Sequence, residues 1–281
     1  MSSVSTRGAT IYFADSGAGP PVILAHSYLC SGEMWSPVLP ALEESHRTIN
    51  VDLRGHGRSS PIERAITLYD LLSDCLAVLD DLHIQTAVWA GLSIGGMIAL
   101  RAALVAPERV SALILLDTDA SAESNARRLQ FGAMSLATRA VGLGPLAPEI
   151  CRRMFGRTTR ELRPALVDEW RKRFAAAHAP SMRRCLEALN RRDSLLDQLG
   201  RITVPSLVLV GDEDVSLPPS RSREIDAALP NSRLDVIPRA GHLCTLEQPE
   251  AVAGAIAAFL RTSKAEHRGE HAGDAPAALR S

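Results

Sequence analysis

Short runs of apolar residues recur along the chain and are separated by longer segments with helical spacing. The runs cover residues 21–25, 47–51, 86–90, 111–116, 205–210 and 233–237. Several of them, such as Leu207-Val208-Leu209-Val210, are continuously apolar rather than alternating, which is typical of parallel strands buried on both faces. The pattern therefore predicts an α/β fold with a mainly parallel sheet and helices on both faces.

The clearest helix covers residues 67–82. One helical face carries only apolar residues, namely Leu68, Leu71, Leu72, Cys75, Leu76, Leu79 and Leu82. Thr67 and Asp70 have the spacing of a capping box, in which each side chain accepts a backbone N–H of the first turn. We therefore expect an amphipathic helix that packs on the sheet.

The alternation of strands and helices stops after residue 120. Residues 121–199 have helical patterns without a strand-like run, and the strand pattern resumes at Val204. This predicts an inserted helical cap, residues 121–199, within a core formed by residues 1–120 and 200–262. Residues 263–281 lack apolar periodicity, so we expect a disordered tail there.

Charge is distributed unevenly between the two predicted parts. The whole chain has a net charge of −1, which gives no indication of a nucleic-acid partner. The predicted cap has fifteen Lys and Arg against eight Asp and Glu, a net charge of +7, which leaves −8 for the other residues. Either these cations form ordinary solvated helix faces, or a basic cap attracts anionic substrates.

The sequence lacks the features typical of membrane proteins, secreted proteins and metal-binding proteins. No apolar stretch approaches the roughly 20 residues that cross a bilayer, and the first residues have no signal-peptide core, so we expect a cytoplasmic protein with no membrane partner. The five cysteines are widely spaced and have no C-x-x-C pattern. We interpret them as packing residues and expect no disulfide, metal or organic cofactor.

The strongest chemical signal is Gly91-Leu92-Ser93-Ile94-Gly95-Gly96, between a predicted strand and the apolar helical stretch 97–106. A G-x-S-x-G sequence in that context forms a tight strand-to-helix turn that exposes its serine hydroxyl. The glycines allow neighbouring backbone to approach closely. Ser93 is therefore the candidate nucleophile.

A serine hydroxyl needs a base to take its proton and a third group to orient that base. His242 follows the last predicted strand in Arg239-Ala240-Gly241-His242, and Asp214 follows the preceding one in Gly211-Asp212-Glu213-Asp214. Asp212 is a local rival for the acid, and Asp117 and Asp119 after an earlier strand are a second alternative. Five other histidines, at positions 46, 83, 178, 267 and 271, are expected at the surface.

An oxyanion hole needs two backbone N–H donors, and losing one typically costs about 3 kcal/mol of transition-state stabilisation. The Ile94 amide is one candidate. The second is the Tyr28 amide, in the loop His26-Ser27-Tyr28-Leu29-Cys30 that follows the first predicted strand. We interpret His26 as a residue that braces this loop.

Four segments in this order resemble the α/β-hydrolase superfamily over residues 4–262: His26 to Trp35, Asp52 to Ser59, the turn at Ser93, and Gly211 to Asp214 with Gly241-His242. The resemblance implies an eight-stranded sheet and the order serine, acid, histidine along the chain. It also implies that His56 stabilises the fold. Serine at position 93 is unlike the haloalkane dehalogenases and related epoxide hydrolases, which have aspartate there. Ser27 departs from the glycine usual in the family.

Within the superfamily, Gly91 to Met97 and Ala106-Pro107-Glu108-Arg109 are most similar to 3-oxoadipate enol-lactonases and small carboxylesterases. This similarity implies hydrolysis of a small ester or lactone through an acyl-enzyme, without a cofactor. Carbon–carbon bond hydrolysis and cofactor-free perhydrolysis, seen as haloperoxidase activity, use the same residues and remain alternatives, as does a ligand-sensing receptor. Trp35 is a candidate substrate contact. Trp89 and Trp170 could also line a pocket, although a large aromatic residue in an α/β protein is more often part of the core.

Overall fold

The mainly parallel sheet predicted from the sequence is present and has eight strands. The computed structural model describes residues 2–272, with side chains as far as residue 262. The strand order is β1-β2-β4-β3-β5-β6-β7-β8; β2 is antiparallel to both of its neighbours, and the other pairs are parallel. The strands are β1 (Ser2–Thr6), β2 (Ala9–Gly17), β3 (Pro21–Ala25), β4 (Arg47–Val51), β5 (Ala87–Leu92), β6 (Val110–Leu116), β7 (Ser206–Gly211) and β8 (Ser232–Ile237).

The hydrophobic pattern predicted β3 to β8 but not β1 and β2. Both of these strands lie at one edge of the sheet, where β1 has no fully buried residue. In β2 only one face is buried: Ile11 and Phe13 are inaccessible to solvent, whereas Thr10 and the last three residues are exposed. Edge strands of this kind lack the continuous apolar run by which buried parallel strands are recognised.

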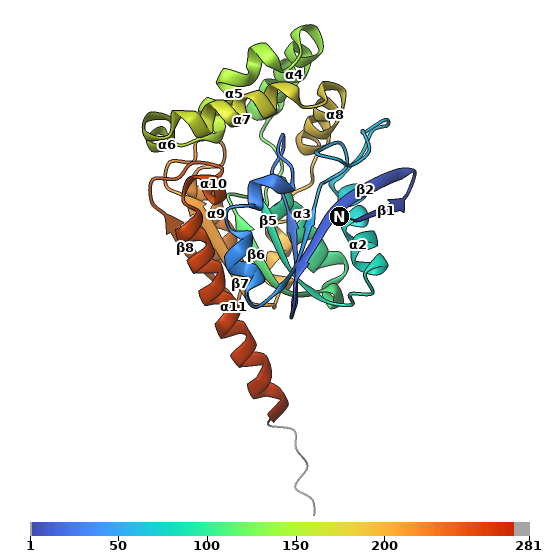
Figure 1. Ribbon diagram of the computed structural model, residues 1–281, viewed down its shortest axis with the longest axis vertical. Coiled ribbons are helices and arrows are strands. Elements are labelled where there is room, and N and C mark those ends of the chain that lie inside the picture. Colours follow the sequence, from blue (N-terminus) through green and yellow to red (C-terminus); the bar gives the residue numbers. More distant parts are fainter. Residues whose placement is uncertain (1, 273–281) are drawn as a thin grey trace, which may run out of the picture.

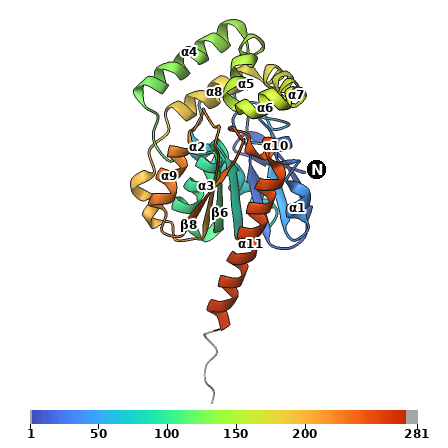
Figure 2. The same cartoon turned by 90° about the vertical axis from the view of Figure 1, so that its left-hand side faces the viewer.

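Helices cover both faces of the sheet (Figure 2). Side chains of α2 (Leu68–Asp81), α3 (Ile94–Val105) and α9 (Pro219–Ala228) belong to the buried cluster on one face. Those of α1 (Leu39–Glu43), α10 (Cys244–Glu247) and α11 (Pro249–Ala272) belong to the cluster on the other. The predicted amphipathic helix is α2, and the Thr67–Asp70 capping box is formed.

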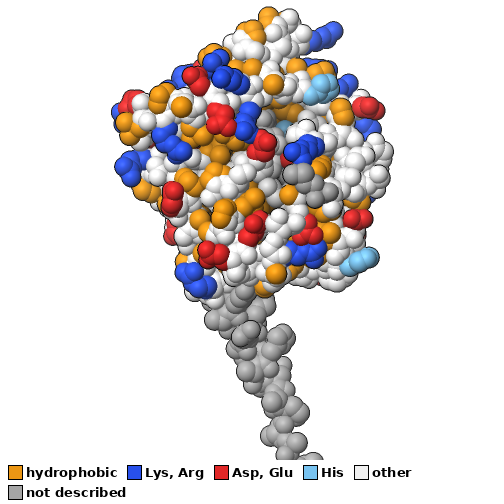
Figure 3. All heavy atoms as spheres, viewed as in Figure 1, with side chains coloured by type: hydrophobic (Ala, Val, Ile, Leu, Met, Phe, Trp, Pro, Cys, Tyr) orange, Lys and Arg blue, Asp and Glu red, His pale blue; other side chains and the backbone are white. Residues whose placement is uncertain are grey.

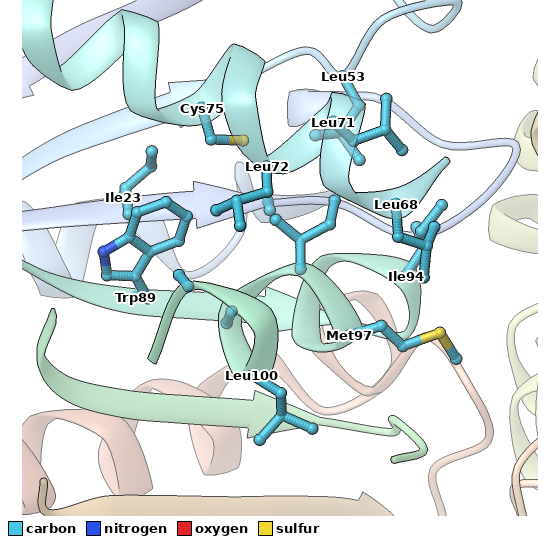
Figure 4. Close-up of a cluster of buried hydrophobic side chains, with 14 of the residues drawn as sticks. Ile23, Leu53, Leu68, Leu71, Leu72, Cys75, Trp89, Ile94, Met97 and Leu100 are labelled. Atoms are coloured by element: carbon cyan, nitrogen blue, oxygen red, sulfur yellow. The ribbon is translucent and has the colours of Figure 1, made fainter. Parts of the chain in front are cut away.

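The central strand β5 shows how one strand supplies both clusters. Trp89 belongs to the same buried cluster as Leu72, Cys75 and Ile94 of the α2 and α3 layer (Figure 4), whereas its neighbours Val88 and Ala90 contribute to the opposite cluster. Successive side chains of a strand point to opposite faces, so a strand covered on both sides must be apolar at every position. This places β5 in the interior of the fold, between the two buried clusters.

Between β6 and β7 the chain leaves the sheet and forms a group of helices that Figure 1 shows together at one end of the molecule. This is the segment predicted as the cap. It contains α4 (Asn125–Val141), η3 (Gly144–Leu146), α5 (Ala147–Met154), α6 (Arg157–Leu162), α7 (Pro164–Ala176) and α8 (Ala179–Asn190). A further 3-10 helix, η4 (Leu196–Arg201), runs across the predicted boundary at 199.

At the other end of the chain, α11 continues to Ala272, past the boundary at residue 262 from which a tail was predicted. The remainder of that predicted tail, 273–281, lies outside the described residues. All five cysteines are free and buried, which agrees with their interpretation as packing residues. Within residues 2–272, no helix has the length and hydropathy needed to cross a membrane.

Candidate active site

Ser93 occupies the turn between β5 and α3 with the backbone angles φ 56° and ψ −115°. Few non-glycine residues adopt a positive φ, and those that do are concentrated at functional turns. A Cβ on Gly95 would overlap the carbonyl oxygen of Ala25, and one on Gly91 would overlap the backbone of Gly95. The two glycines of the motif therefore allow the close approach of strand and helix that this turn requires.

Hydrogen bonds from the neighbouring strand hold the strained serine in place. The Ser93 amide donates to the Leu116 carbonyl at 2.9 Å, and the Thr118 hydroxyl donates to the Ser93 carbonyl at 2.6 Å. Both partners lie at the end of β6, in the adjacent parallel strand or just after it. Thr118 was not identified from the sequence, because nothing in its local pattern marks a residue that contacts a turn 25 positions away.

His242 and Asp214 are in direct contact. Nδ1 of His242 lies 2.8 Å from Oδ2 of Asp214, and both side chains are almost fully buried. The other carboxylate oxygen, Oδ1, accepts the amides of Ser216 at 2.7 Å and Leu217 at 3.0 Å. The carboxylate is thus fixed by its own loop, and it favours the tautomer in which the His242 proton is on Nδ1 and Nε2 is free to accept one.

Two opposing effects act on the pKa of His242. Burial alone would lower the pKa, but the Asp214 carboxylate opposes it by its charge and hydrogen bond, with smaller contributions from Asp117 and Glu247. The net effect raises the pKa of His242 above its ordinary value of 6.5. An imidazole with these neighbours is stabilised in its protonated form, which a general base must reach during a reaction.

The alternative acids have different partners. Asp212 is exposed and accepts the Ala240 amide, as expected of a turn residue. Asp119 is paired with Arg192 at 2.9 Å. Asp117 is fully buried, and its Oδ1 accepts the Gly211 amide at 2.8 Å. Burial and the nearby Asp214 charge raise the pKa of Asp117 well above its usual value. Of the four carboxylates, Asp214 is the one hydrogen-bonded to His242.

Glu247 is a site residue that the sequence did not reveal. Its Oε1 accepts the amides of Gly241 at 2.9 Å and Leu243 at 3.2 Å, the residues on either side of His242. Its Oε2 accepts the Gly156 amide at 2.8 Å, which connects this loop to the cap. A glutamate five residues after the candidate base, in an otherwise apolar segment, is the only local signal that could have indicated it.

His26 holds the loop that contains Tyr28, the second candidate donor of the oxyanion hole. His26 donates from Nδ1 to the Ser27 carbonyl at 2.7 Å and accepts the Leu53 amide on Nε2 at 2.9 Å, so it holds the loop as expected. Burial lowers the pKa of His26 to about 4. Tyr28 lines the same cavity as Ser93 and His242. Ile94 opens α3, where backbone N–H groups have no partner within the helix.

A cavity of about 110 Å³ lies over Ser93 and His242, between the core and the cap. Its wall is mostly apolar, with three arginines and one glutamate among the lining residues. The residues are Ser27, Tyr28, Leu29, Ser93, Met97, Glu123, Arg127, Phe131, Met134, Thr138, Leu143, Ile150, Arg153, Met154, Leu186, Leu189, Arg192, Ser216, Leu217 and His242. The sequence indicated a basic cap but not which of its arginines face a ligand.

Several of the other predictions are changed by the structure. Trp35 was a candidate substrate contact, but it is fully buried in the core and does not line this cavity, so that prediction was wrong. Trp89 is also a core residue, and Trp170 is buried against Phe174. The structure agrees with a structural role for His56, whose Nδ1 lies 3.1 Å from the Arg54 carbonyl.

Of the histidines expected at the surface, His83 and His178 are exposed, but His46 is buried with 5% of its surface accessible. The expectation was therefore wrong for His46. Its side chain lies next to Ser45, with Nδ1 at 2.9 Å from the Ser45 hydroxyl. The side chains of His267 and His271 lie outside the described residues.

Comparison with known proteins also identifies an α/β hydrolase. A family model described as the alpha/beta hydrolase fold matches residues 20–249, and the chain belongs to this family. It is 30% identical to 3-oxoadipate enol-lactonase 2 of Acinetobacter baylyi, over 86% of this chain and 89% of that protein. It is 31% identical to a Mycobacterium tuberculosis protein named as a candidate non-heme bromoperoxidase, over 90% and 98% of the two chains.

Among solved structures, a thermophilic esterase from Thermogutta terrifontis with malate bound superimposes with a TM-score of 0.88 and 31% identity. The match covers 93% of this chain and 97% of that one. The resemblance predicted from the sequence is thereby confirmed at the level of the family, together with the similarity to esterases and enol-lactonases. These similarities support a hydrolase.

Proposed function

We propose that the protein is a serine hydrolase that cleaves a small carboxylic ester or lactone, with Ser93 as nucleophile, His242 as general base and Asp214 as the orienting acid. The observation that carries the proposal is the buried His242–Asp214 hydrogen bond in the cavity that also exposes Ser93. A base that lines the same cavity as the serine, and an acid that orients that base, can activate a hydroxyl group that is otherwise a weak nucleophile at neutral pH.

The reaction would begin when Ser93 Oγ attacks the substrate carbonyl and passes its proton to Nε2 of His242. The oxyanion that forms would accept the amides of Ile94 and Tyr28. Collapse of this intermediate would release the alcohol, which takes the proton from His242, and leave an acyl group on Ser93. Water activated by His242 would then release the acid and regenerate Ser93.

The substrate that the cavity favours has an apolar acyl part and an anionic group. Arg127, Arg153 and Arg192 line the cavity, against Glu123 as the one carboxylate in its wall. Arg192 is fully occupied by Asp119, Glu123 and backbone carbonyls. Arg127 and Arg153 are paired with Glu123 at 3.0 Å and Glu149 at 2.8 Å, but their side chains are 31% and 46% exposed, so they remain accessible to a second anion. The malate in the Thermogutta terrifontis esterase is itself a dicarboxylate, which supports an anionic substrate here.

Many of the other cap arginines have a different role. Figure 3 shows Lys and Arg side chains interspersed with acidic ones over the part of the surface where the cap lies. Several are paired within their own helix, as Arg152 is with Glu149, Arg171 with Asp168 and Arg183 with Glu187. Exposed pairs of this kind contribute little attraction at a distance. Arg153 is paired in the same way, with Glu149, but it lines the cavity. We therefore assign anion recognition to the cavity arginines, because of their position, and not to the cap as a whole.

The proposal is tested by turnover of p-nitrophenyl esters of increasing acyl length and of neutral and carboxylate-bearing lactones, for the wild type and Ser93→Ala. A serine hydrolase should cleave at least one of them, and the variant should lose roughly 10³-fold or more of that activity. Labelling by a fluorophosphonate probe, present in the wild type and absent in the variant, would show that Ser93 is reactive. A folded wild type that is neither labelled nor active would overturn the proposal and favour carbon–carbon hydrolysis or ligand sensing.

A second candidate function is cofactor-free perhydrolysis, favoured by the similarity to the bromoperoxidase-named protein. In this reaction hydrogen peroxide replaces water in attacking the acyl-enzyme and releases a peracid, which oxidises bromide. Bromination of monochlorodimedone in acetate, peroxide and bromide would test it, because a Ser93-dependent signal that requires acetate identifies this route. Bromination that survives Ser93→Ala would exclude it.

A further inference from the structure

Ser27 has a hydroxyl group that no step of the proposed reaction uses. The residue lies in the loop after β3 and is fully buried. It lines the same cavity as Ser93 and His242. Its Oγ has no hydrogen-bond partner among the residues whose side chains are described, 2–262. An unpaired hydroxyl therefore lies in the wall of the cavity that contains the candidate nucleophile.

The main-chain atoms of Ser27 are all hydrogen-bonded, which fixes the position of the residue. Its amide donates to Met34 Sδ at 3.2 Å. Its carbonyl accepts the Cys30 amide at 3.1 Å and Nδ1 of His26 at 2.7 Å. The side-chain hydroxyl is thus the one polar group of Ser27 that is available to a ligand, and it is attached to a rigid backbone.

The loop begins in contact with the first turn of α3. Ala25, the last residue of β3, is paired with Gly91 of β5 in the sheet. The Ala25 carbonyl is so close to Gly95 that a Cβ on this glycine would lie 2.1 Å from the carbonyl oxygen. Ser27 follows two residues later, beside the helix end where the Ile94 amide is a candidate oxyanion donor. The unpaired N–H groups at this end of a helix favour negative charge.

A buried hydroxyl without a partner is unfavourable for the folded protein. The group loses its hydrogen bonds to water and gains none in return. Most buried polar groups in proteins are paired, and an exception calls for a reason such as a catalytic role. A hydroxyl can donate to a negatively charged oxygen, and such a bond is shorter and stronger than one between neutral groups. An oxyanion that forms in the cavity would supply the missing partner.

We propose that the Ser27 hydroxyl is a third donor to the oxyanion, beside the amides of Ile94 and Tyr28. This proposal rests on the proposed hydrolase function and adds a catalytic residue to it. When Ser93 Oγ attacks the carbonyl carbon, the electron pair of the carbon–oxygen double bond moves to the oxygen. Ser27 donates a hydrogen bond to that oxygen, keeps its own proton, and loses the bond when the double bond forms again. Because the full charge exists only in the tetrahedral intermediates, Ser27 stabilises them more than it stabilises the bound substrate.

Steady-state hydrolysis of a p-nitrophenyl ester by Ser27→Ala tests the proposal. The kcat should fall roughly 10- to 100-fold while KM stays within about twofold, the pattern of an interaction made only in the transition state. Ser27→Gly, which introduces the glycine usual in the family, should show the same loss, since both variants lack the hydroxyl. An alkylboronic acid forms a negatively charged tetrahedral adduct with a reactive serine. Its inhibition constant should rise by a similar factor in both variants.

Ser222 of α9 provides the matched control. Its hydroxyl is also fully buried and has no partner within the described part of the chain, but it does not line the cavity. Ser222→Ala should leave kcat and the inhibition constant unchanged. Replacing either serine by alanine removes an unpaired polar group, so the midpoint of thermal unfolding should be no lower than that of the wild type in both variants. If Ser27→Ala lowers the midpoint together with the activity, Ser27 has a structural role and the proposal is wrong.

Two further results would overturn the proposal. One is full activity of Ser27→Ala, and the other is a raised KM at unchanged kcat, which would make Ser27 a contact of the bound substrate only. In both cases Ser93-dependent turnover by the wild type would leave the proposed function standing. A wild type that is inert on esters and lactones alike would refute the proposed function itself, and the role of Ser27 with it.

Discussion

Asp117 and Asp214 are joined through a single residue, because Gly211 donates its amide to Asp117 Oδ1 at 2.8 Å and accepts the Asp214 amide on its carbonyl at 3.3 Å. Both carboxyl groups act on His242, but in different ways. Asp214 contacts His242 directly, whereas Asp117 is buried beside the pair and influences it through charge.

Asparagine substitutions should distinguish the two. Asp214→Asn removes the charge that orients and stabilises protonated His242, and kcat on a p-nitrophenyl ester should fall about 10⁴-fold. Asp117→Asn should change kcat by less than about tenfold, since the hydrogen bond to His242 comes from Asp214 and the contribution of Asp117 to the pKa of His242 is smaller than that of Asp214. Steady-state kinetics with circular dichroism as the folding control would measure this. A greater loss for Asp117→Asn would transfer the role of acid to Asp117.

The pH dependence of kcat/KM should report the protonation of His242. The base acts in its neutral form, and its pKa lies above 6.5, so kcat/KM should fall as the pH drops through a midpoint above that value. Asp214, Asp117 and Glu247 each raise this pKa by their negative charge. Glu247→Gln should therefore move the midpoint to lower pH. Glu250→Gln, which changes an exposed glutamate at the start of α11, should leave it in place. An unchanged midpoint in Glu247→Gln would show that Glu247 acts on the loop by position alone.

The arginines of the cavity over Ser93 should control anion preference. Arg127→Gln and Arg153→Gln should each lower kcat/KM for a carboxylate-bearing lactone by roughly tenfold, about the 1–2 kcal/mol expected of a charged hydrogen bond, with little change for a neutral lactone. Rising salt should weaken the carboxylate preference of the wild type. Arg139→Gln is the matched control, because Arg139 is an exposed arginine of α4 that does not line the cavity. Equal effects on the neutral and charged lactones would contradict anion recognition.

Arg192 should matter for stability. It is buried and pairs with Asp119 at 2.9 Å and Glu123 at 2.6 Å. Arg192→Leu would leave buried Asp119 without a cation and Glu123 with Arg127 alone. Breaking a buried pair in this way typically costs about 3–5 kcal/mol of unfolding free energy. Urea unfolding should show that loss, whereas Arg191→Leu at the adjacent exposed position should stay within about 0.5 kcal/mol. Similar midpoints for the two variants would mean that the network contributes little net stability.

The elements that the sequence predicted correctly are those with a local pattern. Buried parallel strands are apolar at every position, helix α2 has both its stripe and its capping box, and the turn at Ser93 has glycines at fixed offsets. Asp214 and His242 were chosen because each follows a strand of the same sheet, and the structure places the two side chains in contact. In these cases the residues that determine the local structure lie close together in the sequence.

The features that the sequence missed depend on contacts between distant segments. Whether Trp35 lines a cavity or fills the core depends on how the loop after β3 packs, which its spacing does not reveal. Thr118 and Glu247 act on backbone groups of other loops. The arginines that face the cavity over Ser93 come from α4, α5 and the segment after α8, and only the packing of these elements separates them from the exposed arginines of the same cap.

The same packing joins the two ends of the helical insertion to each other. The Leu195 amide donates to the Ala120 carbonyl at 2.7 Å, and Arg192 of the outgoing segment is paired with Asp119 of the incoming one. The chain therefore leaves the sheet and returns to it at one point. An exchange of the helices between these ends for those of another family member would preserve the spacing of β6 and β7 and the turn at Ser93. The His242 loop is the exception, because Glu247 ties it to the Gly156 amide of the insertion, so an exchanged segment would have to supply an equivalent backbone donor at that point.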